Sequence, residues 1–239
     1  DSSGHGVYGQ IFDRQGLKVG NEFRINTYTN QDQIEPAMTR LSNGNFVVSW
    51  SSMRQDSSNE GVFGQIFDPA GSKIGSEFQI NTVTARAQNR ATLANLSSGG
   101  FVTTWSGTDV DGTGVIGQIF DSSGAKVGLE FQINTHTASD QTNPSVSGLE
   151  DGGFVVAWES RLQDGSQTGV YAQRYDSGGQ KVGSEFQVNS HTNSYQHNAF
   201  VETLSGGDFI VSWQSNGQAA AYFDIFSQVF STTNSFEAT

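Results

Sequence analysis

The chain has 239 residues, a formal net charge of −12 and no cysteine, so disulfides and thiolate chemistry are excluded. Its twelve Lys and Arg residues are spread along the sequence instead of clustered, which argues against a nucleic-acid or anionic membrane partner. No apolar run approaches the roughly 18 residues that span a bilayer, and no membrane insertion is expected.

The rarer residues of the sequence recur in register. Tryptophan occurs only at positions 50, 105, 158 and 213, and lysine only at 18, 73, 126 and 181, so both series step by 55, 53 and 55 residues. A tandem array of one structural unit explains this spacing. We therefore predict a single repeat domain over 1–239, with units near 1–60, 61–113, 114–168 and 169–222 and an extra strand at 223–231.

Each unit contains four short segments that are rich in β-branched and aromatic residues, in a pattern typical of strands. In chain order the first type covers 7–12, 62–67, 115–120, 170–175 and 225–230, and the second covers 22–26, 77–81, 130–134 and 185–189. The third type covers 37–41, 91–96, 145–149 and 200–204, and the fourth covers 46–50, 101–105, 154–158 and 209–213. None has the apolar periodicity of a helix.

The turns between these segments also repeat. Asp stands first and Gly fourth in 13–16, 68–71, 121–124 and 176–179, as type I turns favour, and a Gly-containing pair precedes each Trp segment. The unit is therefore an antiparallel meander of four strands. Its size predicts an all-β fold, a β-propeller of about four four-stranded blades with five as the alternative.

The two ends of the chain do not divide evenly into blades. Complete blades are expected near 37–81, 91–134 and 145–189, followed by three strands that end at Phe230. Segment 22–26 could complete that last blade and close the ring, which leaves 7–12 in excess as a duplicate of 225–230. Unpaired terminal strands of this kind can join copies of the chain into a homo-oligomer.

The motifs resemble those of a known group of repeats. Gly/Asn-Phe-Val-Val-x-Trp at 45–50 is followed by Val-x-Gly-Gln-x-Phe-Asp at 62–68, Gly-x-x-x-Gly-x-Glu-Phe at 71–78 and Asn-Thr at 81–82. This order is similar to the tandem repeats of large secreted bacterial and cyanobacterial proteins, and less closely to the blades of sialidase-type propellers. The resemblance implies a lectin- or adhesin-like protein that is extracellular or on the cell surface.

Two sets of side chains occur once per blade and are candidates for ligand binding. The indoles of Trp50, Trp105, Trp158 and Trp213 could stack on sugars, although packing between blades explains them equally well. The polar set could bind sugar hydroxyls, or it could satisfy the amides of its own loops. It consists of Asn26, Gln33, Asn81, Gln88, Asn134, Gln141, Asn189 and Gln196.

A third set is acidic. Asp109 and Asp111, in Asp-Val-Asp-Gly, share part of the pattern of calcium loops, but further ligands are missing and a solvated turn is the alternative. No other metal or cofactor is expected. Each repeated lysine is followed four residues later by Glu, and we expect these residues to pair.

No nucleophile with a neighbouring base is visible, and the repeat symmetry favours several equivalent sites over one catalytic centre. The sequence therefore predicts a non-enzymatic module that binds carbohydrate through repeated sites, with glycans or a protein surface as partners. Alternatives are a structural or oligomerising domain of an adhesin, a carrier of pigment or lipid at an oligomer interface, and a glycoside hydrolase with one asymmetric pocket.

Overall fold

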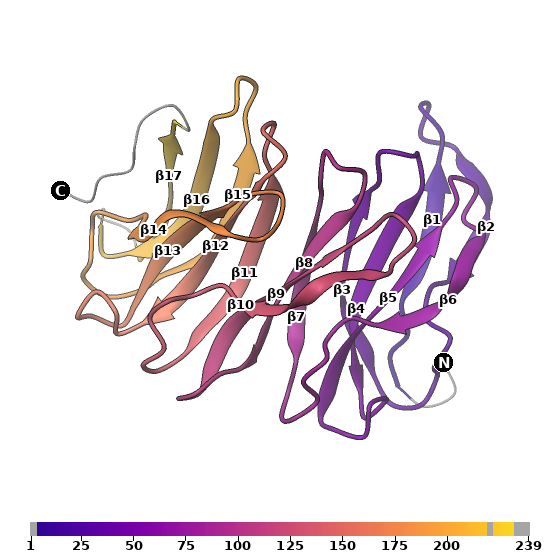
Figure 1. Ribbon diagram of the computed structural model, residues 1–239, viewed down its shortest axis with the longest axis horizontal. Coiled ribbons are helices and arrows are strands. Elements are labelled where there is room, and N and C mark those ends of the chain that lie inside the picture. Colours follow the sequence, from indigo (N-terminus) through magenta and orange to yellow (C-terminus); the bar gives the residue numbers. More distant parts are fainter. Residues whose placement is uncertain (1–3, 219–221, 232–239) are drawn as a thin grey trace.

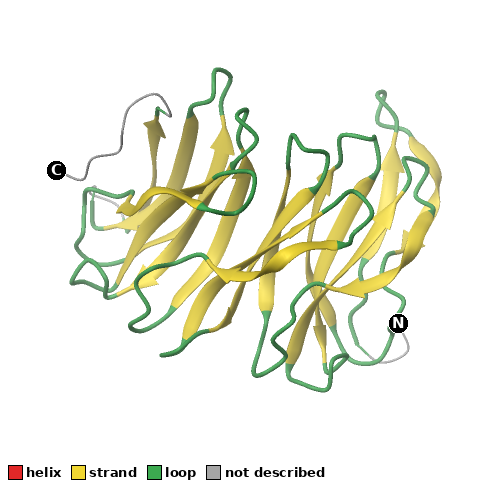
Figure 2. Ribbon diagram, viewed as in Figure 1, coloured by secondary structure: helices red, strands yellow, loops and turns green. Residues whose placement is uncertain are grey.

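The structure is a computed structural model that describes residues 4–218 and 222–231. These residues form seventeen β-strands and no helix, as expected from the sequence (Figure 2). Within the same ranges there is accordingly no helix with the length and apolarity that crossing a membrane requires.

The strands form five antiparallel sheets in chain order (Figure 1). The N-terminal hairpin contains β1 (Tyr8–Phe12) and β2 (Lys18–Arg24). The first repeat sheet contains β3 (Gln33–Arg40), β4 (Phe46–Met53), β5 (Glu60–Phe67) and β6 (Lys73–Gln79). The second contains β7 (Asn89–Asn95), β8 (Phe101–Thr108), β9 (Thr113–Phe120) and β10 (Lys126–Gln132). The third contains β11 (Gln141–Gly148), β12 (Phe154–Arg161), β13 (Thr168–Tyr175) and β14 (Lys181–Gln187), and the fourth contains β15 (Gln196–Thr203), β16 (Phe209–Asn216) and β17 (Phe223–Phe230).

The predicted Asp-x-x-Gly turns join the two outer strands of each sheet. Asp13 Oδ1 accepts the backbone N–H groups of Gln15 and Leu17 at 2.9 and 2.8 Å, and Gly16 takes a φ of 80° that residues with a Cβ rarely adopt. Asp68, Asp121 and Asp176 make the same pair of bonds in the repeat sheets. The turn therefore fixes the register of each outer hairpin.

Consecutive sheets pack face to face through the residues that the repeat conserves among its units. Between the second and third sheets, Val102 and Ile133 belong to the same buried cluster as Phe154 and Trp158. Within the third sheet the ring of Phe154 stacks on Tyr175 of the neighbouring strand, with centroids 4.9 Å apart. Burying side chains of this size stabilises the fold by roughly 1.5–3 kcal/mol each.

The inner strand of each repeat sheet faces a common centre. β3 packs on β7, β7 on β11 and β11 on β15. Together these four strands line one cavity with a volume of 450 Å³. The arrangement is propeller-like, and the N-terminal hairpin and the fourth sheet lie at opposite ends of the row in Figure 1.

The expected closure through 22–26 is not made. β2 pairs with β1, with Tyr8 opposite Arg24, and the fourth sheet ends at β17 with three strands. The reason is local: β1 and β2 are joined by a tight turn, so their pairing costs little loop-closure entropy, whereas pairing of β2 with β17 would join opposite ends of the chain.

Tyr175 provides a test of this packing. Its hydroxyl donates to the carbonyl of Ile133 at 2.7 Å, and burial raises the pKa of Tyr175 well above its ordinary value. The unfolded chain ionises near pH 10 while the folded chain does not, so this contribution to stability is complete below pH 10 and is lost as pH rises further.

We therefore expect Tyr175→Phe to flatten the alkaline loss of stability above pH 10, measured by urea unfolding at several pH values. At pH 7 it should cost only about 1 kcal/mol, for one hydrogen bond. Phenylalanine occupies the same repeat position at 67 and 120, where it is buried, so the variant should fold. An unchanged alkaline profile would contradict the burial assigned to this hydroxyl.

Candidate functional site

A β-bulge interrupts the inner strand of every repeat sheet at the same place. The pairing of each inner strand with its neighbour shifts register there, for example between Ile34 and Ala37 of β3. In each sheet one residue of the bulge takes a positive φ of 53–56° although it is not glycine; these residues are Glu35, Arg90, Asn143 and Asn198. Such backbone is strained and is enriched at functional sites.

The four bulge residues lie at one end of the central cavity. Two positions further along their strands, Ala37 and Thr92 line that cavity, as do the residues directly after Asn143 and Asn198. Because the inner strands run in the same direction, their bulges meet at the same end. The repeat thus gathers four side chains there, and these side chains differ in chemistry.

The residue that follows each tryptophan holds the bulge of the next sheet. Ser51 Oγ accepts the backbone N–H of Arg90 at 3.3 Å, and Ser106 Oγ accepts that of Asn143 at 3.2 Å. In the third sheet this residue is Glu159, whose Oε1 accepts the N–H of Asn198 at 2.7 Å. A bond that hydroxyls make elsewhere is made here by a carboxylate.

Polar contacts connect the bulge residues of the first three sheets. Glu35 Oε2 accepts the hydroxyl of Ser51 at 3.0 Å and the N–H of Arg90 at 3.1 Å. The Arg90 guanidinium lies 3.7 Å from Glu35 Oε1 and also donates to Asn143 Oδ1. Glu35 and Arg90 keep 38% and 53% of their side-chain surface exposed, so a ligand can reach both.

The second carboxylate is more enclosed. Glu159 is only 9% exposed, and its neighbour across the strand pair is Thr142, which precedes the bulge residue Asn143. The central end of the inner strands therefore combines two carboxylates in different surroundings, one guanidinium and two amides. Two carboxylates that flank a substrate can supply a general acid and a general base, while arginine and amides bind hydroxyl groups.

The tryptophans that the sequence suggested as sugar platforms have a packing role. Trp50, Trp105 and Trp158 are fully buried and Trp213 is 6% exposed. Each belongs to a cluster between sheets, and Trp105 Nε1 also donates to Gln88 at 3.0 Å. A sugar needs an exposed indole face, which none of the four presents.

The repeated Asn and Gln side chains are also buried and act on their own loops. Asn26 Oδ1 accepts the N–H of Val7 at 2.8 Å, and its amide donates to Gln33 at 3.0 Å. Corresponding bonds to the strand amide recur in the later repeats, where the exposed fraction of each side chain does not exceed 4%; the residues are Asn81, Gln88, Asn134, Gln141, Asn189 and Gln196. They stabilise the loops between sheets, which was the alternative interpretation.

The calcium candidates do not form a cation site in this structure. Asp109 Oδ1 accepts the N–H of Asp111 at 3.0 Å and its other oxygen accepts the amide of Gln132 at 3.3 Å. Among the described residues no group of three or more histidine or acidic side chains could hold a metal. Asp109 therefore shapes its own turn.

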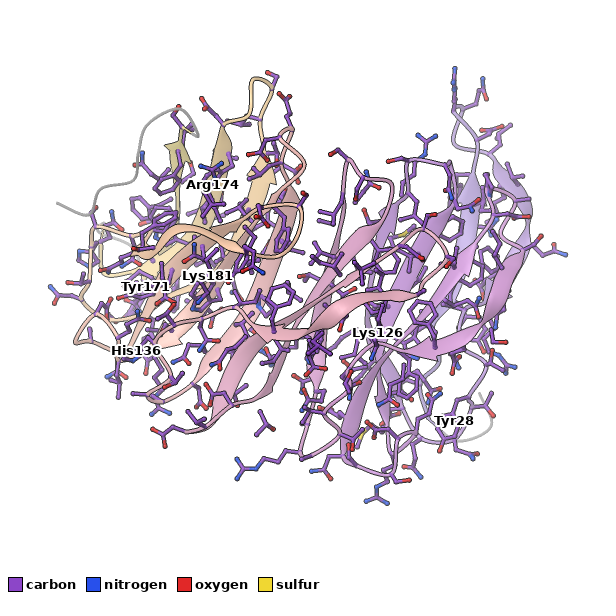
Figure 3. All side chains as sticks on the ribbon, viewed as in Figure 1. Tyr28, Lys126, His136, Tyr171, Arg174 and Lys181 are labelled. Carbon is purple, nitrogen blue, oxygen red and sulfur yellow. The ribbon has the colours of Figure 1, made fainter. Side chains whose placement is uncertain are left out.

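The repeated lysines form a clamp on the outer rim, where Figure 3 labels Lys126 and Lys181. The ammonium groups donate to a threonine of the preceding loop at 2.8–2.9 Å, not to the Glu four residues later, which instead accepts the N–H of that threonine. Partial burial lowers the pKa of Lys73, Lys126 and Lys181 and the nearby Glu opposes this shift. These charged groups are engaged within the protein, so we do not assign the site to the rim.

Comparisons with solved structures show the same fold in larger proteins. A protein of unknown function from Dyadobacter fermentans aligns with a TM-score of 0.65 and 13% identity, over 91% of this chain and 65% of its own. An α-L-arabinanase from Penicillium chrysogenum in complex with arabinobiose has a TM-score of 0.62 and 13% identity, over 85% and 64%. An endo-arabinase from Bacteroides thetaiotaomicron has a TM-score of 0.56 and 14% identity, over 84% and 76%.

The sequence matches no family model and no curated protein. The chain spans 65% of the length of the Dyadobacter protein. The similar structures correct one prediction from the sequence, that of a non-enzymatic binding module, because those with a stated activity are glycoside hydrolases. The expectation of no catalytic centre followed from the repeat symmetry, and the central end of the inner strands is where that symmetry is broken.

Sequence reasoning missed Glu35, Arg90 and Glu159. The signal was present in two aligned positions where the repeats disagree in charge. One position reads Glu, Arg, Asn, Asn at the bulge, and the other reads Ser, Ser, Glu, Gln after the tryptophan. A search for residues that recur draws attention to the scaffold and away from positions of this kind.

Proposed function

We propose that the protein is a glycoside hydrolase whose active site is the central end of the inner strands. The observation that carries this proposal is the meeting of Glu35, Arg90 and Glu159 where all other repeated positions are polar and uncharged. The similarity to arabinanases and arabinofuranosidases supports a substrate that contains arabinose, joined through glycosidic bonds.

The two carboxylates have different roles in this proposal. Glu35 acts as the base or nucleophile, because its carboxylate is held by Ser51 and by the guanidinium of Arg90. Glu159 acts as the acid that protonates the leaving oxygen, because it is the more buried of the two and has one oxygen fixed by a backbone N–H. Pairs of carboxylates perform these roles in most glycosidases. Arg90 and Asn143 would bind sugar hydroxyls.

The finer architecture belongs to the same proposal. We take the four repeat sheets as blades around the central cavity and the N-terminal hairpin as the outer half of a fifth blade. This ring presents one mouth to a polymer, and a polymeric substrate agrees with the expected extracellular or cell-surface location.

Hydrolysis assays test the proposal. The protein should release reducing sugar from arabinan or arabino-oligosaccharides, or the aryl group from an aryl α-L-arabinofuranoside. The rate should follow a bell-shaped pH profile, as expected for one acid and one base. Failure to release product from arabinose-, xylose- and galactose-containing substrates would reject the enzymatic function.

A further inference from the structure

An apolar groove lies between the N-terminal hairpin and the first repeat sheet. It has a volume of 750 Å³, and its walls come from β1, β3 and β4. We call it the terminal groove and define it by Val7, Gly9, Ile11, Met38, Phe46 and Val48. It is on the outer side of the first sheet, away from the carboxylates of the central site.

The terminal groove exposes residues whose repeat equivalents are covered. Met38 is 64% exposed, whereas the corresponding Val146 and Val201 are 8% and 1% exposed. Phe46 is only partly buried, whereas Phe101 and Phe154 at the same position are fully buried. In the later sheets the inner two strands of the preceding sheet provide this cover: Leu96 and Val102 of the second sheet share a cluster with Val146, Phe154 and Val156 of the third.

The strand pairing identifies what is absent from the groove. β1 and β2 correspond to β5 and β6, the two outer strands of the first sheet. In that sheet β4 pairs with β5 along its whole length, from Phe46 opposite Phe67 to Met53 opposite Glu60. In the described part of the chain no strand pairs with the corresponding edge of β1. The N-terminal hairpin is therefore half of a sheet, and the terminal groove has the place of the inner half.

The fourth repeat sheet is uncovered on the complementary face. Ile225 is 78% exposed, whereas Val62, Val115 and Val170 at the same repeat position are fully buried. Val229 is 48% exposed, and its equivalent Ile66 is 2% exposed. Each repeat sheet turns this face toward its successor, so a strand pair seated next to β1 would have apolar surface available on both sides.

We propose that the terminal groove binds a two-stranded β-hairpin with the repeat's own inner-strand pattern, supplied by another polypeptide segment. The hairpin adds to the open edge of β1 through main-chain hydrogen bonds, and it inserts a leucine and a valine against Pro36, Met38 and Phe46. Strand addition of this kind derives its affinity from the backbone bonds and its specificity from alternate side chains. The interface continues the contact that β1 and β2 already make with the first sheet.

The chain itself provides the best probe. β7 and β8, with Leu96 and Val102, pack on Val146, Phe154 and Val156 of the third sheet, beside Pro144. The first sheet carries Pro36, Met38, Phe46 and Val48 at those positions, so its bare face is the nearest match to that surface. A synthetic peptide of residues 88–108 should therefore bind, although the isolated hairpin is unfolded and must order on binding.

We expect this peptide to raise the Tm of the full chain in a saturable, concentration-dependent manner, measured by differential scanning fluorimetry. It should also slow hydrogen exchange of the backbone amides of residues 9–11 more than fivefold. The matched control is a peptide of residues 113–132, which contains the outer strands β9 and β10; it should have no effect, because β1 and β2 already occupy the outer positions.

A variant of the groove distinguishes specific binding from adhesion of an apolar peptide. Met38→Glu places a charge in the groove at an exposed position, so it should fold like the parent chain and bind the 88–108 peptide at least tenfold more weakly. Equal effects of the two peptides, equal binding to the parent and Met38→Glu chains, or no change in β1 exchange at saturating peptide would each overturn the proposal.

Discussion

Replacing Glu159 with glutamine is expected to lower kcat on an arabinose-containing substrate by about 10³-fold, within the range for the loss of a general acid. Glutamine keeps the shape of the side chain and an oxygen that can accept the N–H of Asn198, so the bulge of β15 should keep its position. The Tm should therefore change little while turnover is lost. Steady-state kinetics and thermal unfolding of the same preparation test this prediction.

Glu35→Gln should cause a loss of similar size, with one additional effect. The Arg90 guanidinium would lose its anionic partner, and the binding of sugar hydroxyls should weaken, so KM should rise as kcat falls. Asp111→Asn, in the acidic loop between β8 and β9, is the matched control because it removes a carboxylate outside the central site; it should keep full activity. Activity that survives both glutamate substitutions would exclude these residues as the acid and base.

Trp105→Ala is expected to destabilise the fold by about 3–5 kcal/mol, the usual cost of truncating a buried aromatic side chain. The indole is fully buried in a cluster with Leu41 and Phe101, and its N–H is bonded to Gln88, which would lose its partner. For a chain of this size the loss corresponds to a fall in Tm of roughly 10 °C or more. Thermal and urea unfolding measure it.

The control for this prediction is Leu129→Ala, which removes a large apolar side chain that is 89% exposed and should leave the Tm within about 2 °C of the parent value. The comparison also separates the two interpretations of the tryptophans. A sugar platform would lose affinity with little loss of stability, whereas a packing residue would lose stability first. A stable Trp105→Ala chain with impaired sugar binding would restore the platform hypothesis.

The repeats alone predicted much of the scaffold, because local chemistry repeats with them. Alternating apolar residues defined strands such as β4 and β5, and the Asp-x-x-Gly turn at Asp68 defined the hairpin of β5 and β6. Burial of Trp50 and its equivalents follows from the need of every sheet for the same large side chain at the same place. The sequence could not choose the partner of β2, since β1 and β17 carry the same pattern.

The candidate site could not be predicted for a different reason. The positions of Glu35, Arg90 and Asn143 relative to one another depend on a bulge, and alternation of apolar and polar residues does not reveal a shift in register. Glu159 stands where two other sheets have a serine that bonds the next bulge, so its meaning depends on contacts between sheets. Side chains that break a repeat become informative only once the fold brings them together.

A crystal structure of the Glu159→Gln chain soaked with an arabino-oligosaccharide tests the central site most directly. We predict sugar density at the mouth of the central cavity, with a glycosidic oxygen within hydrogen-bonding distance of residue 159 and with Glu35 on the other side of the bond. Density confined to the outer rim beside Lys73 or Lys181, with the central mouth empty at saturating sugar, would contradict the assignment.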